Sequence, residues 1–161
     1  MKRLVTALVV AGLLVATTAP GAVAKTTKIE ATGTATTTGM IPGTETWVGS
    51  VQSVRGLVLM QDGVWDSVYL TGPQVVTINW DIDYDTGRGK MWGSEHHDVT
   101  AVDGGGWDCR LHAAIVDLVV TGKCVCQGTG TLHTWQWRAD LHMVWNTPGT
   151  ELTGYFFQPG H

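Results

Sequence analysis

The sequence predicts an all-β protein, an antiparallel closed or nearly closed β-barrel of about 8 strands, with a β-sandwich as the alternative. Apolar and polar side chains alternate along Val75–Glu95 on both sides of a turn at 85–89, which is the two-residue period of a β-hairpin with one buried face. The 21 glycines among 161 residues, together with many β-branched residues and Trp, are typical of a turn-rich β domain. Beyond residue 24, no stretch of 10 residues combines a helical period with helix caps.

The first 24 residues have the three parts of a secretory signal peptide. A basic start precedes an apolar run of 13 residues at 4–16, and a small-residue cleavage site follows at 22–24. The run is shorter than the roughly 20 residues that a membrane-spanning helix needs. We therefore expect a secreted or extracytoplasmic protein with no membrane anchor after cleavage. It would consist of a polar N-terminal segment with an edge strand (25–43) and a single barrel domain (44–161).

Glycine, proline and asparagine turns divide the barrel domain into strands. The first strands are expected at 45–61 and 64–70, followed by the two arms of the hairpin, with turns at 62–63 and 72–73 and a flexible stretch at 103–106. Residues 107–127 have two interpretations: one strand to Val120 with a turn at 121–122, or a turn near Asp117. We prefer the second, because it brings Cys109 opposite Cys124 or Cys126. The last strands are expected at 132–145 and 151–158, joined by a turn over 146–149.

Three cysteines in an exported chain allow one disulfide and leave one thiol. Cys124 and Cys126 lie two residues apart on one strand face, too far apart to bridge without distortion. Cys109 is therefore the common partner, and we predict a Cys109–Cys124 disulfide with Cys126 as the other possible partner. Such a bridge closes a loop of about 15 residues and contributes about 3 kcal/mol. The alternative is three buried thiols that form no bridge.

The charge of the chain disfavours two classes of partner. Without Lys2 and Arg3 it carries 8 basic and 14 acidic residues, a net charge of −6, whereas nucleic acids and anionic membranes require a basic face. The sequence also contains no nucleophile elbow, no phosphate-binding loop and no zinc-protease motif. We therefore expect no cofactor, and no reaction class is indicated. The oligomeric state is not specified by the sequence.

Two sets of polar residues resemble metal or catalytic sites. Asp81, Asp83 and Asp85 resemble the start of a calcium loop, but Gly87 falls one position late and Trp92 stands where a bidentate Glu is needed. We therefore assign them to the solvent face of a strand and expect no metal site. Adjacent histidines on a strand point to opposite faces, so His96 and His97 cannot both bind one ion.

A second polar set could serve as acid and base. His112, Asp140 and His142 form a cluster if their strands are neighbours. The simpler interpretation is that they are solvent-facing side chains of half-buried strands, because the opposite faces of these strands are apolar.

Tryptophan is the distinctive residue, with eight in the chain. A barrel of about eight strands has an interior that side chains fill or that holds one small ligand. The candidate ligand-binding residues, which otherwise fill the core, are Trp80, Tyr84, Trp92, Trp137, Leu141 and Trp145. Four further tryptophans lie near glycines or loops, where they could form exposed stacking surfaces for a sugar ring: Trp47, Trp65, Trp107 and Trp135.

The glycine spacing of Gly128-Thr129-Gly130-Thr131-Leu132, the following strand to Trp145, and Gly154-Tyr155 together resemble a group of small secreted bacterial proteins. These are similar to allene oxide cyclase-type barrels, which share their shape with lipocalins. The resemblance spans about Thr44 to Pro159. It implies a barrel and no particular chemistry, because no position here matches a cyclase's catalytic residues and fold does not carry function with it.

Three functions remain from the sequence. The first is a non-enzymatic exported barrel that binds a small, largely apolar ligand in its interior, chiefly by burial of apolar surface. The second is a carbohydrate- or surface-binding module that uses exposed Trp. The third is an enzyme of unknown reaction that works through the His112, Asp140 and His142 cluster. We favour the first.

Overall fold

The computed structural model describes residues 27–145 and 150–158. The predicted signal peptide and the predicted turn at 146–149 lie outside the described residues. The described chain forms nine strands: β1 (Thr27–Ile41), β2 (Thr44–Val48), β3 (Val51–Trp65), β4 (Gly72–Asp83), β5 (Arg88–Asp98), β6 (Gly105–Val116), β7 (Val119–Gly130), β8 (Gln136–Val144) and β9 (Thr150–Gln158). The described part contains no helix that is long and apolar enough to cross a membrane.

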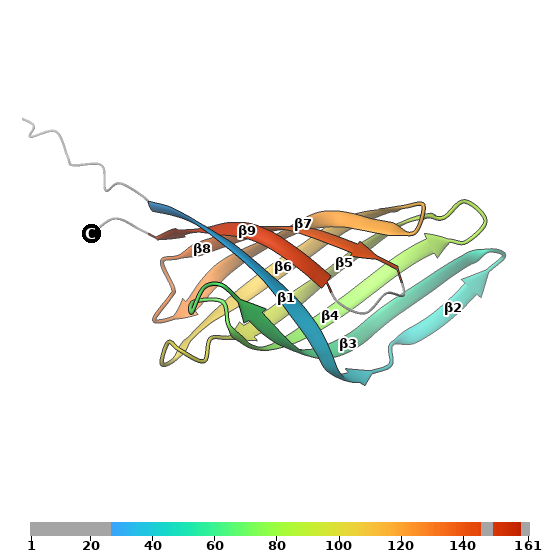
Figure 1. Ribbon diagram of the computed structural model, residues 1–161. Coiled ribbons are helices and arrows are strands. Elements are labelled where there is room, and N and C mark those ends of the chain that lie inside the picture. Colours follow the sequence, from blue (N-terminus) through green and yellow to red (C-terminus); the bar gives the residue numbers. More distant parts are fainter. Residues whose placement is uncertain (1–26, 146–149, 159–161) are drawn as a thin grey trace, which may run out of the picture.

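All nine strands belong to one antiparallel sheet that closes on itself (Figure 1). Their order is β1-β9-β8-β7-β6-β5-β4-β3-β2, and a further pairing of β1 with β3 joins eight of them into a ring. From β3 to β9 each strand pairs with the next one in the chain, as short connections favour. β2 pairs with the first residues of β3 and lies outside the ring. The predicted all-β, antiparallel, closed architecture of about eight strands is confirmed.

The N-terminal segment 25–43 was expected to contain an edge strand; the strand forms as β1, but its edge position is wrong. β1 pairs with β9 through residues 27–35 and with β3 through residues 33–41, so it closes the ring and has no free edge there. Its inward positions are small: Ala31 and Ala35 are buried, and a Cβ atom on Gly33 would overlap the indole of Trp65. Small residues give no apolar signal in the sequence, which is why the segment resembles a polar edge.

β3 continues through Asp62 and Gly63, where a turn was expected, and the separate strand predicted at 64–70 does not form. Asp62 pairs with β1 on one side and β4 on the other, as does Gly63. Backbone hydrogen bonds from two neighbouring strands therefore outweigh the local turn preference of an Asp-Gly pair. The chain turns instead at 66–71, after Trp65.

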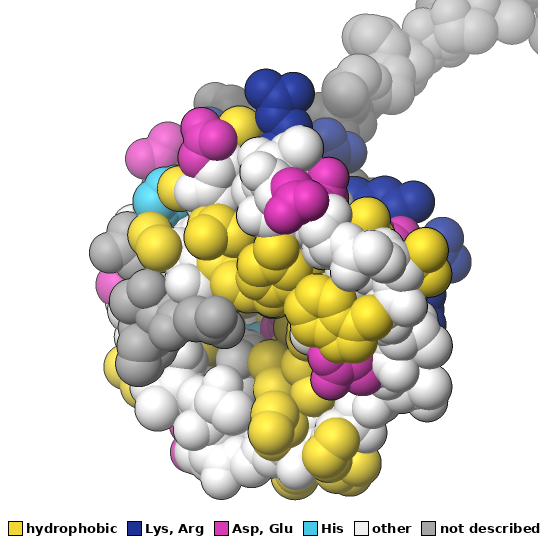
Figure 2. Space-filling model, turned by 90° about the vertical axis from the view of Figure 1, so that its right-hand side faces the viewer, with side chains coloured by type: hydrophobic (Ala, Val, Ile, Leu, Met, Phe, Trp, Pro, Cys, Tyr) yellow, Lys and Arg dark blue, Asp and Glu magenta, His cyan; other side chains and the backbone are white. Residues whose placement is uncertain are grey.

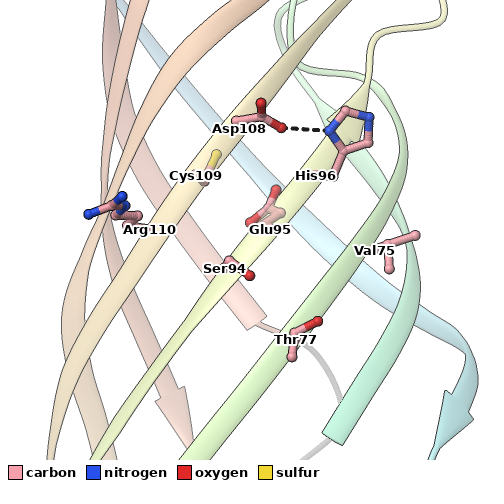
Figure 3. A pocket seen from close by; sticks show the side chains of 8 residues that line it. All are labelled: Val75, Thr77, Ser94, Glu95, His96, Asp108, Cys109 and Arg110. Carbon is pink, nitrogen blue, oxygen red and sulfur yellow. Dashed lines mark hydrogen bonds and ion pairs between the residues drawn. The ribbon is translucent and has the colours of Figure 1, made fainter. Parts of the chain in front are cut away.

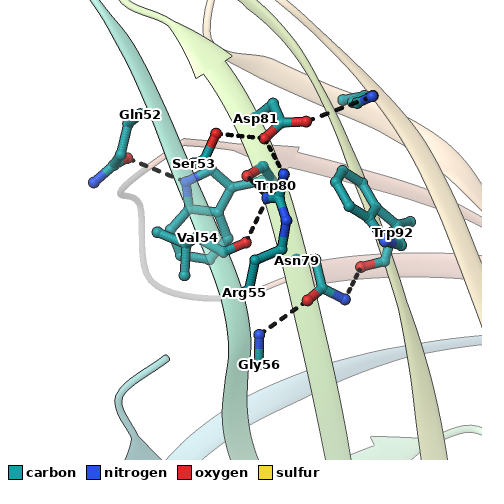
Figure 4. Close-up of polar contacts among 10 residues, drawn as sticks. Gln52, Ser53, Val54, Arg55, Gly56, Asn79, Trp80, Asp81 and Trp92 are labelled. Carbon is teal, nitrogen blue, oxygen red and sulfur yellow. Dashed lines mark hydrogen bonds and ion pairs between the residues drawn. The ribbon is translucent and has the colours of Figure 1, made fainter. Parts of the chain in front are cut away.

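The hairpin of β4 and β5 is confirmed, and it is braced against a bulge in β3 (Figure 4). The pairing shifts between Val54 and Leu57, and Gly56 has a positive φ of 71°, which glycine adopts without strain. The Gly56 amide donates to Asn79 Oδ1 at 2.9 Å, and Asn79 Nδ2 donates to the Trp92 carbonyl. Asn79 thereby joins three strands on the outer face.

The preferred turn near Asp117 is confirmed. β6 and β7 are joined by Asp117 and Leu118 alone, with φ values of 51° and 62°, the left-handed conformation of a tight hairpin turn. Leu118 then links this turn to its neighbours, since its amide donates to the Gly87 carbonyl and its carbonyl accepts from the Trp145 amide.

The two ends of the ring differ. At one end three connections fold inward and bury Leu70, Val99 and Leu132 against the core. Trp107, fully buried, donates from Nε1 to the Tyr69 carbonyl at 2.8 Å and fixes this closure. β2 and the turns after β4 and β6 lie at the opposite end. Figure 2 shows that end as a hollow rimmed by hydrophobic side chains, with acidic and histidine atoms in its depth.

Candidate functional site

Two ionisable side chains of β5 point into the ring. Strand alternation places Ser94 and His96 outside and Glu95 and His97 inside. His97 is 0% exposed and lies in register between Gln74 of β4 and Trp107 of β6. The Glu95 side chain is 10% exposed and is paired in register with Cys109. The expectation that the two adjacent histidines face opposite ways is confirmed.

Several buried polar atoms around these residues have no hydrogen-bond partner among the described residues. They are Trp65 Nε1, Gln74 Nε2, Glu95 Oε1, both ring nitrogens of His97, and Trp137 Nε1. Buried polar groups in folded proteins are nearly always paired, and an unpaired one costs about 1–3 kcal/mol. We call these five residues the interior polar cluster.

The members of the cluster are contiguous although they come from four strands. His97 Nδ1 lies 3.8 Å from Glu95 Oε1, and Gln74 is the register partner of His97. A Cβ atom on Gly63 would overlap Gln74 Nε2 and would lie 3.1 Å from Trp65 Nε1, so these two donors share the space that the glycine leaves. The Trp65 ring packs edge-on against Trp137, with centroids 4.9 Å apart.

Burial keeps the cluster close to neutral. It raises the pKa of Glu95 to about 7 and lowers the pKa of His97 to about 4. At 3.8 Å the two side chains are too far apart for a hydrogen bond, and desolvation outweighs their mutual attraction. Every Lys and Arg side chain in the described part of the chain is exposed. At neutral pH the interior thus presents a neutral imidazole and a carboxyl group that is partly protonated, without a nearby cation.

The hollow end of the ring is lined by aromatic side chains. Trp80 and Tyr84 both donate to Gln52 Oε1, at 3.1 and 3.0 Å. Trp80 packs edge-on against Trp145, with centroids 5.1 Å apart, and Tyr84 stacks on Trp47. Aromatic residues therefore lie near the opening, and the unpaired N–H donors of the interior polar cluster are buried deeper inside the ring.

The structure places five of the six candidate ligand-binding residues on the inner face or at its opening. Trp80 and Trp145 lie near the opening, Tyr84 is 40% exposed beside them, and Trp137 and Leu141 are buried in the core. Trp137 also belongs to the interior polar cluster through its unpaired Nε1.

Trp92, the sixth, lies on the outer face and is corrected (Figure 4). It pairs with Asn79 and His112, and the Arg55 guanidinium lies 4.7 Å from its ring centroid. The inward positions of this part of β5 are Gly89, Met91 and Gly93. Because two of these inward residues are glycines, Trp92 is the largest apolar side chain in this part of the strand. The sequence pattern therefore assigned Trp92 to the inner face, whereas it lies on the outer face.

The predicted Cys109–Cys124 disulfide is also wrong, since Cys109 is bridged to Cys126. The two-residue turn at 117–118 places Cys109 directly opposite Cys126 and Leu111 opposite Cys124. Cys124 remains a buried thiol 3.6 Å from Cys126 Sγ, and burial raises its pKa well above the ordinary thiol range. A disulfide is consistent with an extracytoplasmic protein.

The other candidate sites do not assemble. His112, Asp140 and His142 are all exposed on the outer face, and no hydrogen bond or ion pair joins them in the described part of the chain. In register, Lys123 of β7 stands between His112 and Asp140. The enzyme hypothesis built on this set therefore loses its structural basis.

The exposed-tryptophan surface is not formed by the four residues suggested for it. Trp47 is 54% exposed, but Trp65 and Trp107 are buried and Trp135 is half-buried and stacks on Phe156. A sugar-binding platform needs at least two exposed coplanar rings, and this set offers one.

The outer face carries a polar depression of about 370 Å³ over β4, β5 and β6, and its lining residues include Glu95 and Cys109 (Figure 3). His96 hydrogen-bonds Asp108 at 2.7 Å there, and this contact raises the pKa of His96. Both side chains are exposed, so solvent screens the pair. The acidic row at 81–85 is likewise paired, with Asp81 accepting from Ser53 and Asp83 from Ser50.

Reasoning from the sequence missed Gln74, Glu95 and His97. The signal was present in the alternation itself: Gln74 is in phase with the inward Val76, Ile78 and Trp80, so it is a polar residue on an apolar face.

Neither a scan against protein-family models nor a search of curated proteins finds a match for this chain. The resemblance to allene oxide cyclase-type barrels stays a prediction.

Proposed function

We propose that this protein binds one small, neutral, largely apolar molecule that carries an oxygen acceptor inside the ring of strands. The observation that carries the proposal is the interior polar cluster: the N–H donors of Trp65, Gln74 and Trp137 are buried inside the ring and unpaired among the described residues, and the open end of the ring is a hollow rimmed by hydrophobic side chains (Figure 2). Apolar walls with a few convergent polar groups are the usual composition of a ligand site. The disulfide supports a role outside the cytoplasm.

The charge of the interior supports a neutral ligand. Glu95 is the carboxyl group of the cluster, and the described Lys and Arg side chains all lie outside. A carboxylate ligand would be buried without a cation and beside a group that is itself partly ionised, which is costly. A ketone, ester or ether oxygen, in contrast, accepts from the indole and amide N–H groups at no charge cost.

The expected strength follows from two contributions. Burial of apolar ligand surface contributes about 25 cal/mol per Å² before the cost of immobilisation. A hydrogen bond to a donor that otherwise stays unpaired adds about 1–1.5 kcal/mol, or about tenfold in affinity. Among molecules of equal size, the protein should therefore bind those with an oxygen acceptor more tightly than those without one.

Three probes of matched size test the proposal by isothermal titration calorimetry: 4-tert-butylcyclohexanone, tert-butylcyclohexane and 4-tert-butylcyclohexanecarboxylate. We expect the ketone to bind about tenfold more tightly than the hydrocarbon, and the carboxylate to bind most weakly. If none of the three binds, or if the carboxylate binds best, the proposal is wrong.

Tryptophan variants locate the binding. Trp65→Phe and Trp137→Phe remove an indole N–H and should reduce the preference for the ketone over the hydrocarbon. Trp92→Phe is the matched control, because Trp92 lies on the outer face beneath Arg55. An equal effect of all three substitutions would place the probe elsewhere and contradict interior binding.

A further inference from the structure

We propose that the interior polar cluster catalyses proton transfer at the carbon next to a ligand's carbonyl group, with Glu95 as the base. This rests on the proposed function, since the carbonyl compound must first enter the ring. The geometry supplies three parts: a buried carboxyl oxygen without a hydrogen-bond partner among the described residues, unpaired N–H donors in the same interior polar cluster, and an interior enclosed by strands. These are the elements of a site that forms and stabilises an enolate.

The carboxyl group is placed to act as a base. Glu95 Oε1 is buried and accepts no hydrogen bond from any residue that the structure describes, so its lone pairs are free to receive a proton from a bound molecule. Burial raises the pKa of Glu95 to about 7, which balances the fraction of carboxylate against its basicity at neutral pH.

The groups packed around Glu95 do not compete for the proton. On β4 its register partner is Val76, on β6 it is the disulfide-bonded Cys109, and on its own strand His97 is the next inward residue. Burial lowers the pKa of His97 and raises that of Cys124, so both are uncharged at pH 7. Glu95 is thus the group of this set that changes charge near neutrality.

The unpaired N–H donors belong to the same interior polar cluster as Glu95. Gln74 Nε2 and Trp65 Nε1 both border the space left by Gly63, and Gln74 is in register with His97, which is 3.8 Å from Glu95. Where two N–H donors reach the same oxygen of a bound molecule, they stabilise negative charge on it strongly in a dry site. They favour the enolate over the neutral ketone, which is what lowers the barrier.

The step is balanced without a further reactant. The Glu95 carboxylate takes a proton from the α-carbon, the C–H electron pair forms a C=C bond, and the carbonyl π pair moves to oxygen. The same carboxyl group then returns the proton, either to the α-carbon or, in an unsaturated ketone, to the far end of the conjugated system. The outcome is proton exchange or double-bond migration, with no change of oxidation state.

Exchange of the α-hydrogens of 4-tert-butylcyclohexanone in D₂O, followed by ¹H NMR, tests the inference. The wild-type protein should accelerate exchange above the buffer rate, with a rate that rises with pH up to about 7 and then levels. Glu95→Gln should lower the exchange rate at least 100-fold while still binding the ketone. Glu30→Gln, a substitution of an exposed residue on β1, is the matched control and should exchange as the wild type does.

Binding is measured by calorimetry on the same samples, which separates the two proposals. If the wild type binds the ketone but exchange proceeds at the buffer rate, or if Glu95→Gln exchanges as fast as the wild type, the catalytic inference is overturned and interior binding stands. If the ketone does not bind, both proposals fail together.

Discussion

The pH dependence of stability should differ between the wild type and variants at Glu95 and His97, because burial shifts their pKa values in opposite directions. Glu95 has an ordinary pKa of 4.5 and a folded pKa of about 7, whereas His97 falls from 6.5 to about 4. The perturbations are Glu95→Gln, His97→Gln and the double variant. Each single substitution removes one titrating group and keeps a polar side chain of similar size, and the double variant removes both groups.

The pKa shift of each group gives the direction and the size of its effect on the free energy of unfolding. Below pH 4.5 the contribution of Glu95 is fully present; as pH rises toward 7 the unfolded chain loses its proton and the folded chain keeps it, so the free energy of unfolding falls by about 3 kcal/mol. For His97 the contribution is full above pH 6.5 and is lost as pH falls toward 4, again by about 3 kcal/mol. Between pH 4.5 and 6.5 the two slopes oppose each other and cancel in the wild type.

Urea unfolding at half-unit steps from pH 4 to 8 measures these slopes. Relative to the wild type, Glu95→Gln should gain stability as pH rises from 4.5 to 7, because only the opposing contribution of His97 remains. His97→Gln should lose stability, relative to the wild type, as pH rises from 4 to 6.5, and the double variant should be flat relative to the wild type between pH 4.5 and 6.5. For either single variant, a difference from the wild type that does not change with pH would refute the shifted pKa values and, with them, the buried, near-neutral cluster.

Three further predictions concern the framework around the cluster. Removing the disulfide with Cys109→Ala and Cys126→Ala should lower the free energy of unfolding by about 3 kcal/mol in denaturant titrations, and an equal loss in Cys124→Ala would contradict the observed pairing. Replacing Asp117-Leu118 by Asn-Gly should raise the melting temperature, because both positions have positive φ, and a lower melting temperature would contradict the turn geometry. Gly63→Ala should displace Gln74 and weaken ketone binding while Gly49→Ala, where a Cβ meets no atom, leaves binding unchanged; equal binding in both would show that Gln74 takes no part.

The closed sheet could be predicted because its evidence is local. The alternation of β4 and the hairpin turn before β5 depend only on neighbouring residues, and they place Trp80 and Ile82 on the inner face as expected. The preferred turn near Asp117 also came from local reasoning, through the cysteines that it brings together.

What could not be predicted depends on glycine and on exact register. Gly89 and Gly93 leave Met91 as the one apolar side chain at the inward positions of residues 89–93, so periodicity alone could not show that Glu95 and His97 face inward. The disulfide partner depends on a turn of only two residues, and Leu is an unusual residue at a positive φ. One residue more in that turn would shift every pairing of β7 against β6.

The most direct test of interior binding observes the indole N–H groups themselves. In a two-dimensional ¹H–¹⁵N spectrum of protein labelled at tryptophan and assigned by Trp→Phe variants, titration with 4-tert-butylcyclohexanone should shift the Trp65 and Trp137 indole signals and leave the Trp92 signal in place. A shift of Trp92 with unchanged Trp65 and Trp137 signals would contradict binding over the interior polar cluster.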